Sequence, residues 1–281
     1  MASPDPYCIR SVSMPTGSHP ILSQVKEQVH QLSCEHMNSS SSEWFIGNLR
    51  NLYNDLDDLL RLPLAQHVLC KCKDEVEELV EDSLSLLDAC DKMRGVVAKV
   101  REQQQGILST IRRRDHFGLD ELVSIYIRSR KKMTKDLTRC LGTIATMSKC
   151  IPSDGQNHQS IARDCQVMDV LRLARSVTVS YCHTLITGLA RGSNRWSLIS
   201  KFLRMRPLES GHVETCELEH LDMILWPLHA CSSKLKEACS QDALRLLDSV
   251  EDRLGSIEEQ LGCLCNLLIR MRVTLLNILT N

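Results

Sequence analysis

Apolar residues recur at every third or fourth position along the C-terminal part of the chain. From Leu247 to Ile278 the steps alternate between three and four residues without a miss. Such spacing places the apolar side chains in one stripe along a single long helix. One heptad position of this stripe is leucine throughout, at Leu247, Leu254, Leu261, Leu268 and Leu275. The pattern predicts a closing helix that begins near Ser240 and runs to the C-terminus.

Two arrangements would bury this stripe. A leucine heptad favours a coiled coil, and so a homodimer through the C-terminal helix. Further along, four more apolar residues widen the stripe: Cys265, Leu267, Leu276 and Leu279. A wide stripe needs several neighbouring helices. We therefore expect the closing helix to be a central stave of an intramolecular bundle, with its first two heptads the part most able to protrude or dimerise.

The same periodicity marks helices along the rest of the chain. Segments with a continuous apolar face are 18–32, 43–62, 75–90, 93–111, 119–149, 161–190 and 216–239. In the second of these, Trp44 is expected to face inward. Pro63 should end or kink that helix, and residues 65–72 are expected to form a short turn. Gly118 marks the turn before the long helix that follows it.

Turn-forming and polar residues divide the chain into a tail and one domain. Residues 1–17 contain Pro4, Pro6 and Pro15 and are expected to be a disordered N-terminal tail. Residues 18–281 are expected to form a single helical-bundle domain. Its internal connectors lie near 151–160 and 206–215, where Pro, Gly and Ser replace the apolar pattern.

The composition favours the same fold class. Hydrophobic residues make up 43% of the chain, but only 4% of the residues are aromatic. Leu, Val, Ile, Met and Cys suit helix packing better than a β-sandwich. We expect an all-α protein, an elongated multi-helix bundle with a long heptad-patterned C-terminal helix. No transmembrane segment is expected, because the most apolar window, Leu261–Leu279, carries Arg270 and Arg272.

The 14 cysteines favour a reducing compartment over a disulfide scaffold. The N-terminus is polar and broken by prolines, so no signal peptide is expected. Cys90, Cys140 and Cys239 occupy apolar helix positions, where a free thiol behaves as a small buried hydrophobe. Because disulfides are rare in reducing compartments, the expected location is cytoplasmic.

No stretch of the sequence carries a strong catalytic or metal-binding signature. Two Cys-x-Cys pairs would point apart on a helix: Cys70 with Cys72, and Cys263 with Cys265. The best-spaced candidates would share one helix face, although Gly211 argues against a helix there: His212, Cys216 and His220. An enzyme with a non-standard site would need a deep pocket with converging titratable groups. We expect no cofactor and no enzymatic activity.

A short motif in the tail resembles a docking site for 14-3-3 proteins. Arg10, Ser11, Ser13 and Pro15 match the pattern R-S-x-S-x-P. Phosphorylation of Ser13 would create a dianion for an arginine cluster, and Pro15 would turn the chain out of the groove. The alternative is an ordinary serine-rich tail, since short motifs match by chance. We expect a protein partner, with a 14-3-3 protein as one candidate.

Two basic runs stand out from a chain whose net charge is only −1. The first is Arg112–Arg114. The second forms a candidate contact face: Arg128, Arg130, Lys131, Lys132 and Lys135. Such runs are usually exposed helix sides, but they also suit phospholipid headgroups or a nuclear import receptor. Nearby acids dilute the field and no aromatic platform lies among them, so no nucleic-acid site is expected.

Several stretches together resemble one plant family. They are Arg10–Pro15 with Ser18–Pro20, Asn48–Pro63, Val76–Asp88, Ile111–Arg114, Arg130–Met133 and Arg272–Asn281. In this order, and over nearly the whole chain, they are similar to the plant-specific Bypass-type family. The resemblance implies a helical protein without known catalytic residues. For the best-studied branch it also implies a role in root and shoot development, through control of a mobile root-derived signal.

Two functions follow from these observations. The first is a non-catalytic intracellular adaptor or regulator in root and shoot development, acting by protein binding. The second is a peripheral membrane protein that binds anionic lipid through the basic face at 128–135. Binding to anionic vesicles separates the two.

Overall fold

The computed structural model describes residues 20–35, 42–149, 164–190, 218, 221–223, 225 and 233–280. Seven helices have their bounds within these residues: α1 Pro20–Glu35, α2 Ser42–Leu60, α3 Pro63–Lys71, α4 Lys73–Arg112, α5 His116–Lys149, α6 Asp164–Ala190 and α9 Ser233–Thr280. The same residues contain no strand. The prediction of an all-α bundle is confirmed.

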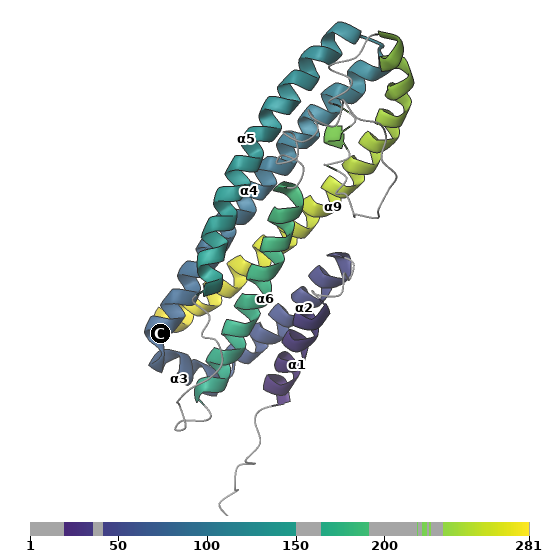
Figure 1. Cartoon of the computed structure of the whole chain (residues 1–281). Coiled ribbons are helices and arrows are strands. Elements are labelled where there is room, and N and C mark those ends of the chain that lie inside the picture. Colours follow the sequence, from purple (N-terminus) through teal and green to yellow (C-terminus); the bar gives the residue numbers. More distant parts are fainter. Residues whose placement is uncertain are drawn as a thin grey trace, which may run out of the picture.

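Three long helices, α4, α5 and α9, give the molecule its elongated shape (Figure 1). α4 packs chiefly against α9 and α5, and α5 packs against α6. The pair α1 and α2 covers the lower half of the bundle, where α1 contacts α6 and α2 contacts α9. The core therefore runs along the molecule between helices that are distant in sequence.

α9 packs chiefly against α4 and α2, and also against α3. All five leucines of its first heptad position are at most 2% exposed: Leu247, Leu254, Leu261, Leu268 and Leu275. Burying one leucine side chain stabilises a fold by about 1.5–3 kcal/mol relative to leaving it exposed. The predicted central stave is confirmed, and the helix begins at Ser233, earlier than the predicted start near Ser240.

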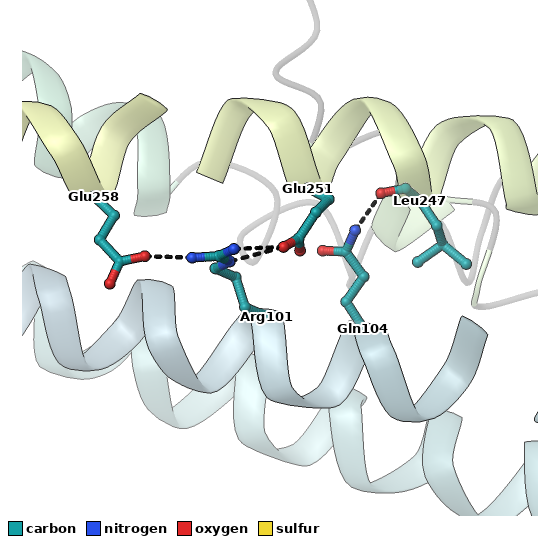
Figure 2. Close-up of polar contacts among 5 residues, drawn as sticks. All are labelled: Arg101, Gln104, Leu247, Glu251 and Glu258. Carbon is teal, nitrogen blue, oxygen red and sulfur yellow. Dashed lines mark hydrogen bonds and ion pairs between the residues drawn. The ribbon is translucent and has the colours of Figure 1, made fainter. Parts of the chain in front are cut away.

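The first two heptads of α9 do not protrude. Figure 2 shows the guanidinium of Arg101, in α4, between the carboxylates of Glu251 and Glu258 in α9. The side-chain amide of Gln104 donates to the carbonyl oxygen of Leu247 (Figure 2). These heptads were expected to be the part most able to protrude or dimerise; they do not protrude, because α4 is 40 residues long and reaches this part of α9. A homodimer through the C-terminal helix stays a prediction.

Within α9, Leu244–Thr280 is long and apolar enough to cross a membrane, judged by length and composition alone. A buried core helix passes the same test, so this is weak evidence for a span. Arg270 donates to the side-chain oxygen of Asn54 at 2.6 Å, and Arg272 donates to the carbonyl oxygen of Val80. These bonds hold α9 against α2 and α4 inside the bundle.

The connection between α2 and α4 differs from the prediction. The residues expected to form a turn, 65–72, belong mostly to α3, which begins at Pro63. Proline is tolerated at the first helical position, since the N–H that it lacks has no partner within a helix. The backbone N–H of Cys72 closes α3, and α4 then runs unbroken through both predicted segments, 75–90 and 93–111.

The turn between α4 and α5 also differs from the prediction. In this turn Arg114 adopts a positive φ of 57°. Gly118, which was expected to mark the turn, lies within α5. A carboxylate oxygen of Asp115 accepts a hydrogen bond from the backbone N–H of Gly118 at 3.0 Å. This capping bond satisfies a donor of the first helical turn, an interaction that stabilises a helix by about 1 kcal/mol. It explains why α5 starts at His116, before the predicted start.

Trp44 does not face inward as predicted, and 39% of it is exposed. Its neighbour Phe45 is buried instead and stacks on Tyr181 of α6, with ring centroids 4.6 Å apart. Successive helical residues point about 100° apart, so only one of the two aromatic residues can face the core.

Several predictions concern residues outside the described ranges. These include the disordered tail at 1–17 and the connectors near 151–160 and 206–215. Of the predicted helix 161–190, the structure describes Asp164–Ala190, which is helical throughout. Of the predicted helix 216–239, the described residues are all helical.

Candidate functional site

A groove of about 630 Å³ lies between α4 and α5. The wall that α4 provides consists of Lys92, Gly95, Val96 and Lys99. These residues follow one another at steps of three or four or lie side by side, so they share one face of the helix. The wall that α5 provides consists of Ser129, Lys132, Met133, Asp136, Leu137 and Arg139. We call this feature the α4–α5 groove.

The groove is open because two of its lining residues are small. Gly95 has no side chain, and a β-carbon added there would meet no atom within 4 Å. Ser129 is the corresponding small residue on α5. Between them lie the buried side chains of Val96, Met133 and Leu137. The floor of the groove is therefore apolar, and its side chains are at most 8% exposed.

The rim of the groove is mainly basic. Lys99 pairs with Glu102 at 2.7 Å, and Arg139 pairs with Asp136 at 2.8 Å. Lys92 and Lys132 are exposed, and neither forms an ion pair with an acid among the described residues. An apolar floor between two such cations suits an amphipathic ligand that carries negative charge.

The predicted basic face agrees only in part with the structure. Arg128, Lys131, Lys132 and Lys135 are exposed, and their spacing of one, three or four residues places them on one side of α5. Arg130, however, is fully buried, with 0% exposure. The prediction that Arg130 belongs to this contact face was wrong, because the residue lies on the side of α5 that packs into the bundle.

Arg130 belongs instead to a buried polar cluster. Its Nη1 donates to the carbonyl oxygen of Leu189 at 2.8 Å, and its Nε lies 3.4 Å from a carboxylate oxygen of Asp222. The hydroxyl of Tyr126 donates to the other carboxylate oxygen of Asp222 at 2.6 Å. Burial raises the pKa of Tyr126, so its hydroxyl remains a donor. The cluster joins α5 to α6 and to Asp222.

Sequence reasoning missed Asp222, the acid of this cluster. A signal for it was present: Asp222 follows Leu221 and precedes Leu225 by three positions, and it shares their burial. An acid at such a position in an apolar pattern needs a buried partner. Which basic residue provides that partner depends on the fold.

Three of the described cysteines pack in the core as small apolar side chains. Cys90 and Cys140 are buried as predicted, and Cys182 is buried as well. The side chain of Cys239 lies outside the described residues. Contact with Cys182 raises the pKa of the Cys90 thiol, and contact with Cys90 raises that of Cys265. Neutral thiols are poor nucleophiles, so this cluster serves packing.

The metal candidates do not converge within the part of the chain that the structure describes. There, no group of three or more His, Cys, Asp or Glu residues could hold a metal ion. Cys70 contacts the carbonyl oxygen of Ile278 at 3.7 Å, and Cys263 accepts a hydrogen bond from Arg50 at 3.3 Å. The third candidate set lies outside the described residues: His212, Cys216 and His220.

The 14-3-3 motif also lies outside the described residues, at Arg10, Ser11, Ser13 and Pro15. It stays a prediction from sequence.

Comparison with known proteins finds one family. Residues 46–278 match the family model described as Protein BPS1. No curated protein and no solved structure matches the chain. The matched range begins within α2 and ends near the C-terminus of α9, so it includes both walls of the α4–α5 groove.

Proposed function

Since the chain belongs to the BPS1 family of plant Bypass proteins, we propose that it is a non-catalytic regulator of root and shoot development. It acts by binding a protein in the α4–α5 groove. One observation supports this proposal most strongly: the groove combines an apolar floor with the exposed cations Lys92 and Lys132. A groove between two helices is suited to a third helix that has an apolar side flanked by acids.

We also propose an intracellular location. The eight cysteines that the structure describes are all free, and three of them are buried. Unpaired thiols in this number suit a reducing compartment.

The groove can be filled without disturbing the fold. Gly95→Leu adds a side chain to a position on the groove wall where a β-carbon meets only open space. Leucine is also a better helix former than glycine. Gly142→Leu is the matched control, because Gly142 is an α5 glycine with equally open surroundings that does not line the groove.

Proximity labelling in plant tissue tests the proposal. The wild type and Gly142→Leu should label the same neighbouring proteins, whereas Gly95→Leu should lose at least one of them. Identical neighbours for all three chains, each present at equal abundance, would show that the groove is not the binding site.

Membrane binding is the second candidate function. Two observations favour it: the exposed cations Arg128, Lys131, Lys132 and Lys135 lie on one side of α5, and Phe117, beside Arg112–Arg114, is 91% exposed. Each cation near an anionic bilayer contributes about 1 kcal/mol. Flotation with vesicles of anionic phospholipid at low salt tests this candidate. Binding that Lys131→Glu with Lys135→Glu abolishes would support it, and no flotation of the wild type would remove it.

A further inference from the structure

α9 carries a second heptad pattern on the side that faces away from the core. Ile269, Val273 and Leu276 are 49%, 50% and 38% exposed and follow one another at steps of four and three residues. The same steps extend the set, which we call the outer seam: Gly262, Asn266, Ile269, Val273, Leu276 and Thr280. Asn266 and Val273 each precede a buried leucine by two positions, so the outer seam lies nearly opposite the leucine stripe. The next position toward the N-terminus is the acid Glu259, where the seam ends.

Hydrogen bonds on either flank of α9 fix the direction of the outer seam. On one flank, the hydroxyl of Thr274 donates to a carboxylate oxygen of Asp57 in α2 at 3.1 Å. On the other flank, Arg272 donates to the carbonyl oxygen of Val80 in α4. This part of α9 therefore lies between α2 and α4, and the outer seam faces the surface.

We propose that the outer seam binds the outer seam of a second copy of this chain, with the two α9 helices parallel. A parallel two-stranded coiled coil favours β-branched residues at heptad position a and leucine at position d. Val273 at a and Leu276 at d match this preference, and Ile269 at d departs from it. The leucine stripe that predicted a homodimer from sequence is buried within one chain, so the contact passes to the outer seam.

Asn266 favours a parallel dimer in one register. It occupies position a one heptad before Val273, and its side chain is exposed. A single asparagine at position a specifies the number of strands and their register, at a cost in stability. The two amides can bond to each other only when the helices are parallel and aligned. An antiparallel pair centred on Val273 would bring Asn266 to Thr280 instead.

The charges beside the seam favour the same orientation. In a parallel pair, Arg270 of one copy flanks the seam next to Cys265 of the other. Asp91 of α4 lies within electrostatic reach of Cys265, so Arg270 approaches a carboxylate across the interface. Arg94 stands within the same reach and weakens this attraction. An antiparallel pair about the middle of the seam would bring the two copies of Arg272 together.

Size-exclusion chromatography with light scattering, on the full chain over a range of concentrations, tests the association. The wild type should dimerise. Val273→Glu places two carboxylates at the centre of the seam and should raise the dissociation constant about tenfold or more. Leu173→Glu is the matched control, because it makes a similar change at an α6 residue that is 45% exposed. It should leave the dissociation constant unchanged, and circular dichroism establishes that each variant is folded.

Asn266→Val separates a contact at the seam from a loss of folding. It replaces the polar residue at position a by an apolar one, so the dimer should bind about tenfold more tightly. Damage to the fold cannot tighten association.

Photo-crosslinking tests the orientation. Benzoylphenylalanine is introduced in place of Thr280, the variant is mixed with isotope-labelled copies, and links between copies are identified by mass spectrometry. A parallel pair should link position 280 to residues 276–281 of the other copy.

Four outcomes overturn the inference. They are a wild type that is monomeric at every concentration, a dimer that ignores Val273→Glu, an Asn266→Val dimer that is no tighter than the wild type, and links from position 280 to residues around Asn266. If the wild type is monomeric and Val273→Glu lowers its flotation with anionic vesicles, a lipid surface covers the seam instead. The outer seam lies outside the α4–α5 groove, so none of these outcomes decides the proposed function.

Discussion

Arg128 and Arg130 are two residues apart in one basic run, yet one is exposed and the other is buried against Asp222. Which of the two is buried follows from the side of α5 on which each residue lies. Residues at steps of three and four around Arg130 are buried, among them Ile127, Thr134 and Leu137. Periodicity alone therefore could have placed Arg130 inward. The identity of its partner could not be predicted, because Asp222 comes from a distant part of the chain.

A change at the buried residue tests this difference. Arg130→Met keeps most of the side-chain volume but leaves the carboxylate of Asp222 buried without its cation. Breaking a buried pair in this way costs about 3–5 kcal/mol of unfolding free energy. Arg128→Met removes an exposed charge and should change the unfolding free energy by no more than about 0.5 kcal/mol. Urea denaturation measures both, and equal losses for the two variants would contradict the assignment.

At the scale of elements, the presence of a helix could be predicted from sequence much better than the residues at which it begins and ends. The leucine stripe of α9 predicted a buried stave, because its period is a local property of the chain. α3 was not predicted. Pro63 was expected only to end or kink the helix before it, but it also begins α3. The start of α5 depends on the Asp115 side chain, whose capping bond was not anticipated.

The burial of α9 predicts a contrast between two of its own residues. Leu261 is fully buried, whereas Ile269 is 49% exposed. Leu261→Ala should lower the unfolding free energy by about 2–5 kcal/mol, because it removes methyl groups and leaves a cavity. Ile269→Ala should lower it by much less. Urea denaturation below the concentration at which any dimer forms provides the comparison. A similar loss at Ile269 would mean that the opposite side of α9 is packed as well.

At the scale of the whole molecule, the α4–α5 groove arises from residues that no local pattern connects. Gly95 and Ser129 are both small, but only the pairing of α4 with α5 brings them into one groove. The basic run on α5 could be found from sequence. That Lys132 of this run lines the same groove as Lys92 could be learned only from the fold.

The groove gives the BPS1 family fold a surface through which a helical protein without a catalytic signature can act. The apolar floor and the cations beside it line one groove between α4 and α5. The opposite side of α4 is packed against α9.

Developmental rescue tests the central claim most directly. Plants that lack this protein are supplied with the wild type, Gly95→Leu or Gly142→Leu at equal protein abundance, and root and shoot growth is measured. We expect the wild type and Gly142→Leu to restore growth and Gly95→Leu to fail. Full restoration by Gly95→Leu would contradict the account, because the protein would then act with its α4–α5 groove filled.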